Sequence, residues 1–296
     1  MENKKLRVVV TGAGGFVGER LMEIDRDRFE LVPVSLRTTP VEAIDLSGVD
    51  SIVHLAGKAH EMKPVDDQVY YDVNYGLTKK LAEEARRQKV PHFVYISSVK
   101  VWGDETGGPL NEHSPCEPTD AYGKSKLQAE EMLLHGSAVS FKVAVVRPPL
   151  VYGPRVKGNM IKLLQLADKN YPLPFGGIRN LRSMVYVDNL VELINTIVDQ
   201  QASGIYLAGD EQPVSTEFLV RTIRKSLGKP ENMISLPGAV RMLLRAVKPA
   251  LYTRLYGSYI IDNSLTNKRL SFHPPVSTQT GIRHMVDWYK EMASRK

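Results

Sequence analysis

The fold is decided near the start of the chain, in the stretch LRVVVTGAGGFVG at residues 6–18. Residues 6–11 form a continuous apolar run rich in β-branched side chains, which is typical of a strand buried on both faces. Glycines then precede apolar residues at helical spacing, and a strand, glycine turn and helix in this order predict a dinucleotide site. Its contacts would come from the turn and from the free N–H groups of the helix start: Gly12, Gly15, Phe16, Val17 and Gly18.

Apolar runs alternate with helical patterns through the first half of the chain. Further strands are expected at 31–36, 51–55, 93–97 and 143–146, with the longest helical patterns at 69–88 and 121–134. This alternation predicts an α/β fold, a doubly wound parallel sheet of the Rossmann type with helices on both faces.

The pattern changes after Tyr152, where Pro and Gly interrupt shorter segments. A second, smaller mixed lobe is therefore expected. A strand at 185–187 and a helix at 189–198 are expected to return to the first domain. We expect the dinucleotide-binding domain to comprise residues 1–152 plus about 182–205, and the second lobe about 153–181 plus 206–296.

The composition is that of an ordinary folded protein. Of the 296 residues 43% are hydrophobic and 24% charged, which excludes disorder and coiled coil. No signal-peptide pattern follows Met1, so a cytoplasmic location is expected. The single cysteine excludes an internal disulfide, and no Cys/His spacing predicts a metal. The net charge of +6 comes without a nucleic-acid motif, so no nucleic-acid partner is expected.

Residues 239–261 combine apolar side chains at helical spacing with Arg241, Arg245, Lys248 and Arg254. The segment is too charged to span a bilayer, so no membrane insertion is expected. Two interpretations stay open, a helix lying in the membrane interface and a helix pair lining a pocket for an anion. The pocket is favoured, which makes Arg254 a candidate for binding an anionic substrate.

Tyr122 and Lys126 are four residues apart, so on a helix they lie on one face, one turn apart. A nearby cation lowers the pKa of a tyrosine, which would make Tyr122 an acid/base near neutral pH. Ser97 and Ser98 end the apolar run of the expected strand at 93–97, at the sheet edge where open α/β sheets bind ligands. A serine there could orient a substrate carbonyl oxygen, although it could equally cap a loop.

Several motifs in recognisable order carry a family resemblance. They are the glycine turn, HLAG at 54–57, Asn74, SVKVWG at 98–103, YGKSK at 122–126 and RPPLVYGP at 147–154. Together they resemble the extended short-chain dehydrogenases/reductases of the NAD-dependent epimerase/dehydratase family, which modify nucleotide sugars. The resemblance covers about residues 6–200.

The resemblance implies roles for individual residues. Ser98, Tyr122 and Lys126 would be the catalytic residues, with Lys126 also holding the nicotinamide ribose. Leu55, Ala56 and Gly57 would bind the cofactor. Asn159 and Arg182 match positions that contact the diphosphate of the sugar nucleotide. From the residues alone, Asn159 could instead cap a helix at 160–168 and Arg182 could be a surface cation.

Two departures from the family's epimerases point to a subgroup. Lys100 stands where they usually have Ser or Thr, and Leu150 where they have Asn. These phrases resemble the 4-reductases that act on UDP-4-keto-6-deoxy-N-acetylhexosamines and form UDP-N-acetylquinovosamine. Lys100 would either point into the substrate cleft or face solvent, and both remain open.

The end of the second expected strand bears on the cofactor. NAD sites of this fold generally place an acid there to bind the ribose 2′-hydroxyl, whereas this chain has Ser35 and Arg37. Both could bind a 2′-phosphate, so NADP(H) is favoured and NAD(H) is possible. By family analogy Asp45 and Leu46 would meet the adenine edge, although a local Asx turn would explain Asp45 as well.

These observations predict a reductase that transfers hydride from NADPH to the carbon-4 ketone of a UDP-linked 4-keto-6-deoxy-N-acetylhexosamine. One alternative is a UDP-sugar 4-epimerase that retains NAD. Another, from a different class, is a non-catalytic nucleotide-sensing module. A homodimer is possible.

Overall fold

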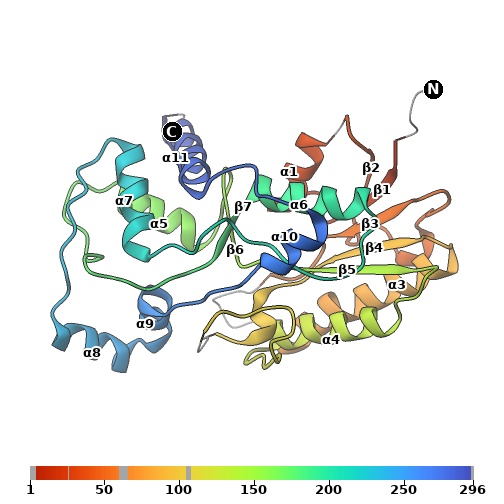
Figure 1. The fold of residues 1–296 in the computed structure, drawn as a ribbon, viewed down its shortest axis with the longest axis horizontal. Coiled ribbons are helices and arrows are strands. Elements are labelled where there is room, and N and C mark those ends of the chain that lie inside the picture. The colour runs from red at the N-terminus through yellow and green to blue at the C-terminus, as the bar shows by residue number, and fades with distance from the viewer. Residues whose placement is uncertain (1–4, 26, 60–65, 105–107, 295–296) are drawn as a thin grey trace.

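A computed structural model describes residues 5–25, 27–59, 66–104 and 108–294. Its centre is a six-stranded, all-parallel sheet in the order β2-β1-β3-β4-β5-β8 (Figure 1). The predicted parallel α/β sheet is thereby confirmed. Its strands are β1 (Arg7–Thr11), β2 (Glu30–Val34), β3 (Ser51–His54), β4 (His92–Ile96), β5 (Lys142–Arg147) and β8 (Gly204–Leu207).

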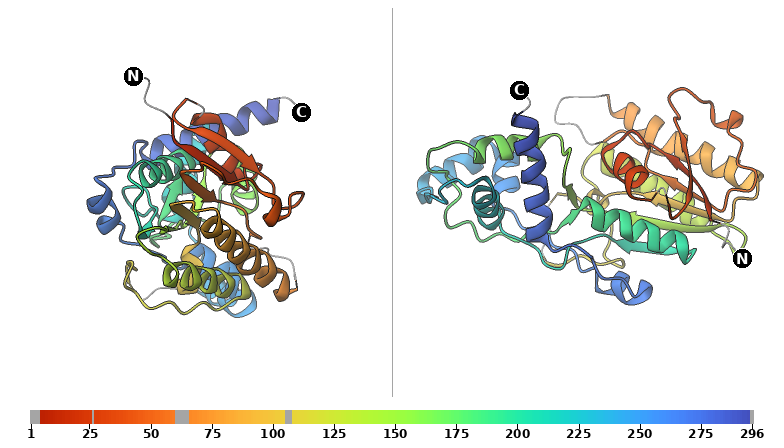
Figure 2. Two further views of the ribbon diagram at one scale, coloured as in Figure 1. Left: turned by 90° about the vertical axis from the view of Figure 1, so that its right-hand side faces the viewer. Right: turned by 90° about the horizontal axis from the view of Figure 1, so that it is seen from above.

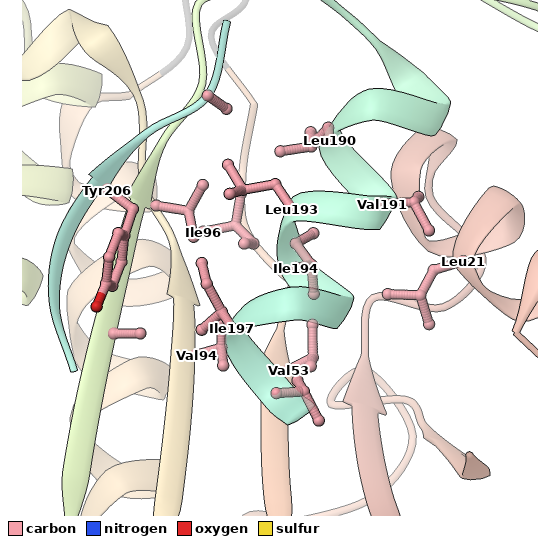
Figure 3. Close-up of a cluster of buried hydrophobic side chains, with 14 of the residues drawn as sticks. Leu21, Val53, Val94, Ile96, Leu190, Val191, Leu193, Ile194, Ile197 and Tyr206 are labelled. Carbon is pink, nitrogen blue, oxygen red and sulfur yellow. The ribbon is translucent and has the colours of Figure 1, made fainter. Parts of the chain in front are cut away.

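Helices cover both faces of this sheet because its central strands are apolar on both sides. On one face α1 (Phe16–Ile24) and α6 (Val187–Asp199) pack on β1, β3, β4 and β5. Figure 3 shows Leu190, Leu193 and Ile197 of α6 turned toward the strand residues Val94 and Ile96. On the other face α3 (Thr78–Arg87) and α4 (Ala121–His135) bury a second apolar cluster.

The helical pattern expected at 69–88 is observed from residue 67 to residue 87, with an unusual middle. It comprises α2 (Asp67–Tyr70), a π-helical turn η2 (Tyr71–Leu77) and α3. The wider turn of a π-helix inserts an extra residue and re-aims the side chains around it. Buried Asn74 lies in this turn.

A second layer of structure lies at the other end of the molecule (Figure 2). Two short parallel strands, β6 (Leu150–Tyr152) and β7 (Met184–Tyr186), pair with each other. Three helices pack around them in a separate apolar cluster: α5 (Asn159–Ala167), α7 (Thr216–Leu227) and α11 (Thr278–Ser294). The strand expected at 185–187 therefore pairs with β6 outside the main sheet, whereas the helix that follows it packs on that sheet.

Asp210 joins the two layers through its buried carboxylate. Its oxygens accept hydrogen bonds from the Tyr152 hydroxyl at 2.7 Å, the Asn189 side-chain amide at 2.7 Å and the Tyr186 backbone N–H at 3.0 Å. These donors come from β6, α6 and β7. A fourth, longer contact comes from the hydroxyl of Thr278 on α11. One side chain thus ties the small sheet to a helix of the large one.

The expected boundary between residues 205 and 206 falls inside β8, which pairs with β5 as far as Leu207. After β8 the chain returns once more to the main sheet, because Leu270 at the end of α10 (Ser264–Leu270) and Phe272 belong to the cluster under α6. The apolar cluster under α6 and the cluster of α5, α7 and α11 are therefore built from segments that alternate along the chain.

Two helices lie between α7 and α10: α8 (Gly238–Val247) and α9 (Pro249–Tyr256). Neither contains a buried residue. Among the described residues no helix has the length and apolar character needed to cross a membrane.

Candidate functional site

The glycine turn packs too tightly for side chains. Gly12 has φ +74°, and a Cβ there would lie 2.6 Å from the backbone nitrogen of Ala56. A Cβ on Gly18 would lie 2.2 Å from the carbonyl oxygen of Gly12. Helix α1 begins at Phe16 without a side-chain cap, so no side chain covers the N–H groups of its first turn. A short, uncapped helix start behind a glycine cradle fits the diphosphate of a dinucleotide.

The neighbouring cofactor candidates lie at this turn and at the adjacent strand end. Phe16 and Val17 turn their side chains into the apolar clusters, so only their backbones are available to a phosphate. Leu55, Ala56 and Gly57 directly follow β3, and the Ala56 backbone N–H approaches the Thr11 hydroxyl at 3.4 Å. The carboxyl ends of β1 and β3 thus bring both segments to one edge of the sheet.

Ser98 and Tyr122 meet at the carboxyl end of β4. Ser98 precedes the 3₁₀ turn η3 (Val99–Trp102), and its hydroxyl accepts a hydrogen bond from the Lys100 backbone N–H at 3.2 Å. The same side chain hydrogen-bonds the phenol of Tyr122, the second residue of α4. Tyr70 of α2 packs edge-on against the Tyr122 ring, with ring centroids 6.0 Å apart. The structure brings these two candidate residues together at one end of the sheet.

Burial raises the pKa of Tyr122, and the hydrogen bond with Ser98 opposes that shift. This corrects the expectation that a nearby cation lowers it. The ammonium of Lys126 is directed elsewhere, donating to the Ile96 carbonyl at 2.9 Å and lying 4.7 Å from the centre of the Tyr95 ring. Tyr122 is therefore a neutral phenol at pH 7, the form that donates a proton.

Lys126 is 5% exposed, and burial lowers its pKa to about 8. Asn74 lies beside it: a Cβ added to Gly57 would be 3.0 Å from the Asn74 side-chain oxygen and 3.3 Å from Lys126 Nζ. The Asn74 side chain is fixed by the backbone of Lys58 and by the Ser125 hydroxyl. Asn74 of the π-turn and Lys126 thus both lie against the backbone of Gly57.

A buried histidine supports this edge from below. The ring nitrogens of His54 hydrogen-bond the hydroxyls of Thr11 and Thr78 at 2.6 and 2.9 Å. Burial lowers the pKa of His54 to about 3, and the charge of Lys126 adds to the effect. His54 is thus neutral and structural, linking β1, β3 and α3 beneath the loop that carries Gly57.

Lys100 is partly exposed and is held by two carboxylates. Its ammonium pairs with Asp104 and, at 2.9 Å, with Asp120, which also caps α4. Burial acts to lower the pKa of Lys100, but the hydrogen bonds to both carboxylates outweigh it and the pKa is raised. These ion pairs join η3 to the start of α4, and contact of Lys100 with the substrate stays a prediction.

Arg182 and Arg254 lie close enough to affect each other. Burial lowers the pKa of Arg182, and the charge of Arg254 lowers it further. Arg182 donates to the Gly257 carbonyl at 3.1 Å, just beyond α9. It is half-buried, so it is no simple surface cation. Asn159 is the exposed first residue of α5, and Gly158 holds the capping position that had been open to Asn159.

Ser35 and Arg37 follow β2 in an exposed turn, and no acidic residue stands between Val34 and Pro40. The Asp45 carboxylate accepts from the Ser47 backbone N–H at 2.9 Å, which is the Asx turn considered above. Leu46 is fully buried among apolar side chains, and its N–H donates to Gln88. The structure gives Asp45 and Leu46 these structural roles, and their contact with adenine stays a prediction.

Sequence reasoning missed a buried ion pair behind the site. Arg147, at the end of β5, binds Glu130 of α4 with a shortest N–O distance of 2.6 Å, and both side chains are at most 4% exposed. The guanidinium also stacks over Trp102. Glu130 follows Lys126 by one helical turn, a spacing that could have indicated the link. A cavity of about 320 Å³ lies away from these residues, between α1 and α11.

The sheet order, the glycine turn and the strand-end site define a Rossmann-type α/β protein. Residues 8–209 match the model of the "NAD dependent epimerase/dehydratase family". The chain belongs to this family of enzymes.

Two curated relatives share almost a third of their residues with the chain. The UDP-glucose 4-epimerase of Vibrio cholerae is 32% identical, over 97% of each chain. The N-acetyl-alpha-D-glucosaminyl-diphospho-ditrans,octacis-undecaprenol 4-epimerase of Escherichia coli O157:H7 is 31% identical, over 80% of this chain and 77% of its own length.

Solved structures share the fold at lower identity. A UDP-N-acetylglucosamine 4-epimerase from Methanobrevibacter ruminantium M1, bound to UDP-N-acetylmuramic acid, superposes with a TM-score of 0.80 at 19% identity, over 98% of this chain and 100% of that one. RMD from Pseudomonas aeruginosa, complexed with NADPH, gives 0.77 at 18%, and UDP-glucuronic acid 4-epimerase from Bacillus cereus, with NAD, gives 0.75 at 21%; each covers 97% of this chain and 99% of its own.

Proposed function

We propose that the chain carries out oxidoreduction at carbon 4 of a nucleotide-linked sugar, and specifically the NADPH-dependent reduction of the carbon-4 ketone of a UDP-linked 4-keto-6-deoxy-N-acetylhexosamine. The observation that carries the proposal is the hydrogen-bonded pair of Ser98 and neutral Tyr122 at the carboxyl end of β4. Ketone reduction needs a proton donor at the oxygen, and a phenol whose pKa is raised is such a donor.

Each residue has one task in this proposal. Tyr122 donates its proton to the carbon-4 oxygen, and the Ser98 hydroxyl hydrogen-bonds the same oxygen and orients it. Lys126, whose ammonium is held by the Ile96 carbonyl, would bind ribose hydroxyls of the dinucleotide. The nicotinamide would supply the hydride when bound.

The glycine turn and the helix α1 start would hold the diphosphate of the dinucleotide. NADPH is proposed over NADH because no acid follows β2 and Arg37 is exposed there. Arg182 and Arg254, paired in one region, would bind the diphosphate of the substrate. We accordingly assign the cofactor to the layer of the six-stranded sheet and the sugar nucleotide to the layer of α5, α7 and α11.

A UDP-sugar 4-epimerase with retained NAD is the second candidate. The printed names of the Vibrio cholerae and Escherichia coli relatives favour it. The same Ser98 and Tyr122 would then serve both directions of proton transfer. Arg37 and Lys100 favour the reductase over the epimerase, but they do so only through the sequence patterns described above.

The deciding experiment supplies the purified protein with UDP-4-keto-6-deoxy-N-acetylglucosamine and either NADPH or NADH, and identifies the sugar product by NMR. The reductase consumes one NADPH per 4-hydroxy sugar formed. In parallel, UDP-N-acetylglucosamine and UDP-glucose are incubated without added cofactor. Conversion of either UDP-sugar to its own 4-epimer, without net cofactor consumption, would establish the epimerase instead. Tight nucleotide binding with no turnover of any substrate would leave a nucleotide-sensing module.

A further inference from the structure

An exposed apolar surface lies on α8 and the start of α9. Val240, Met242, Leu243 and Val247 are 44%, 74%, 63% and 66% exposed, and Leu251 is 37% exposed. Five large apolar side chains within twelve residues exceed the scattered single exposures that soluble surfaces normally show. Val240, Leu243, Leu244 and Val247 share one helical face by their spacing.

The polar residues of this surface all have one sign. Arg241, Arg245 and Lys248 lie beside the apolar face at i, i+4 and i+7, and all three are exposed. Residues 232–261 contain no Asp or Glu. An apolar face flanked by cations and free of acids is complementary to a layer that is apolar within and negative at its surface.

The surface lies at the periphery of the molecule and is attached to it by packing contacts. Figure 1 shows α8 at the edge of the second layer, remote from the six-stranded sheet. Helix α9 anchors it, because Leu255 and Tyr256 pack on the cluster of α5, α7 and α11. Arg245 of α8 lies over the Tyr252 ring of α9, which stacks on Tyr256.

We propose that this α8–α9 surface, formed by Val240, Leu243, Val247 and Leu251 with Arg241, Arg245 and Lys248, docks the protein on an anionic lipid bilayer. The helices lie in the interface, with apolar side chains among the acyl chains and cations at the phosphates. This realises the interfacial helix that the sequence had left open, whereas a pocket lined by the pair does not account for the exposure of α8. The inference does not depend on the reaction proposed above.

Charge selects the bilayer over a second copy of the chain. Apposing two such surfaces would bring three cations against three like charges across an apolar contact, which opposes pairing. An anionic bilayer neutralises the same cations. Docking also orients the site, because Arg254 lies on α9 and its charge reaches Arg182. The candidate diphosphate-binding arginines therefore lie close behind the docked surface.

Co-sedimentation with lipid vesicles tests the proposal. The protein should pellet with vesicles of phosphatidylcholine and phosphatidylglycerol at low salt, with less binding as salt rises, and should stay in solution with phosphatidylcholine alone. Leu243→Glu with Val247→Glu should lower partitioning more than tenfold. Arg241→Gln, Arg245→Gln and Lys248→Gln together should lower it about a hundredfold.

Matched controls change the same chemistry elsewhere. Val139→Glu alters an apolar side chain that is 95% exposed after α4, and Lys5→Gln, Lys79→Gln and Lys80→Gln remove three exposed cations. Neither should reduce vesicle binding by the factors above. Turnover of a soluble sugar nucleotide, measured on the Leu243→Glu, Val247→Glu variant, should equal that of the parent, which separates docking from the reaction. Absence of binding to anionic vesicles would overturn the proposal, as would a lipid-free dimer that this variant dissociates.

Discussion

Tyr122 has a hydrogen-bonded phenol whose proton is retained by burial, so its removal is a direct test of the site. Tyr122→Phe keeps the ring that packs on Tyr70 and deletes only the hydroxyl. We expect the free energy of unfolding and the affinity for the nucleotide to be unchanged, and turnover to fall by about a hundred- to ten-thousandfold. Steady-state kinetics beside a urea titration measures both. Parental turnover would transfer the acid role to another residue.

Burial of the charged Lys126 ammonium should lower the free energy of unfolding of the protein. Its folded pKa of about 8 lies below the ordinary 10.5, so the unfolded chain binds this proton more tightly. The penalty is complete below pH 8 and disappears as pH rises from about 8 to 10.5. At pH 7 we expect the free energy of unfolding of Lys126→Met to exceed that of the parent by about 2 kcal/mol. This is about 3 kcal/mol of relieved burial less about 1 kcal/mol for the lost hydrogen bond to Ile96, and the variant should be inactive.

Denaturant titrations from pH 7 to 10 measure this effect. The stability of the parent relative to Lys126→Met should rise across that interval, because the parent alone sheds the buried charge. If the difference in unfolding free energy between the two proteins did not vary with pH, burial would not lower the pKa of Lys126.

Arg37 carries the proposed preference for NADPH. A charge-assisted contact to phosphate contributes about 1.5–3 kcal/mol, so Arg37→Ala should weaken NADPH use by about ten- to a hundredfold. NADH lacks the phosphate and should be unaffected, so the ratio of the two Michaelis constants is the readout. Equal losses for both cofactors would assign Arg37 to the shared adenosine site, and a parent that prefers NADH would defeat the assignment.

The residues of the site that could be predicted are those whose geometry is local. Tyr122 and Lys126 share a helix face and Ser98 follows a strand, and these local patterns, read together with the glycine turn and the family resemblance, suggested one common site. Their electrostatics could not be predicted. The pKa of Tyr122 depends on burial beside Tyr70, and the partners of Lys100, Asp104 and Asp120, are 16 residues apart in the sequence.

At the scale of elements, the turn between β1 and α1 depends on backbone contact at Gly18. Gly18→Ala would push a Cβ to 2.2 Å from the Gly12 carbonyl, and neither backbone can yield without opening the turn. We expect the variant to be about 1–3 kcal/mol less stable and to bind dinucleotide more weakly. Gly14→Ala is the control, since nothing lies within 4 Å of its Cβ. Calorimetric titration should separate the two, and equal affinities would contradict the model of a tight cradle.

The long strands and helices could be predicted because each is patterned along its own length, as β1, β4 and β5 are. Two elements, β8 and the π-turn η2, could not. Strand β8 has four residues and is recognised only by its pairing with β5, some sixty residues earlier. The π-turn around Asn74 has the same apolar pattern as the α-helices on either side, so its extra residue leaves no signal in the sequence.

For the whole molecule, Asp210 is the joint between the two layers. Asp210→Ala strands three buried donors, from Tyr152, Tyr186 and Asn189, and should cost about 3–5 kcal/mol of unfolding free energy. Asp287→Ala on the exposed face of α11 is the matched control and should stay within about 0.5 kcal/mol. Thermal unfolding followed by circular dichroism gives both values. A loss at Asp210 no larger than at Asp287 would show that the layers are held by apolar packing alone.

The interleaving of the two clusters has a consequence during synthesis on the ribosome. Five strands of the large sheet are complete once residue 147 has emerged, yet the edge of β5 stays uncovered until β8 follows more than fifty residues later. Helix α6, which covers one face of this sheet, is also synthesised after β5. Leu270 and Phe272, which pack in the same cluster, follow still later. A nascent chain of intermediate length therefore presents an unpaired strand edge beside an apolar face, the combination that invites aggregation, and chaperone protection would be needed most between residues 147 and 272.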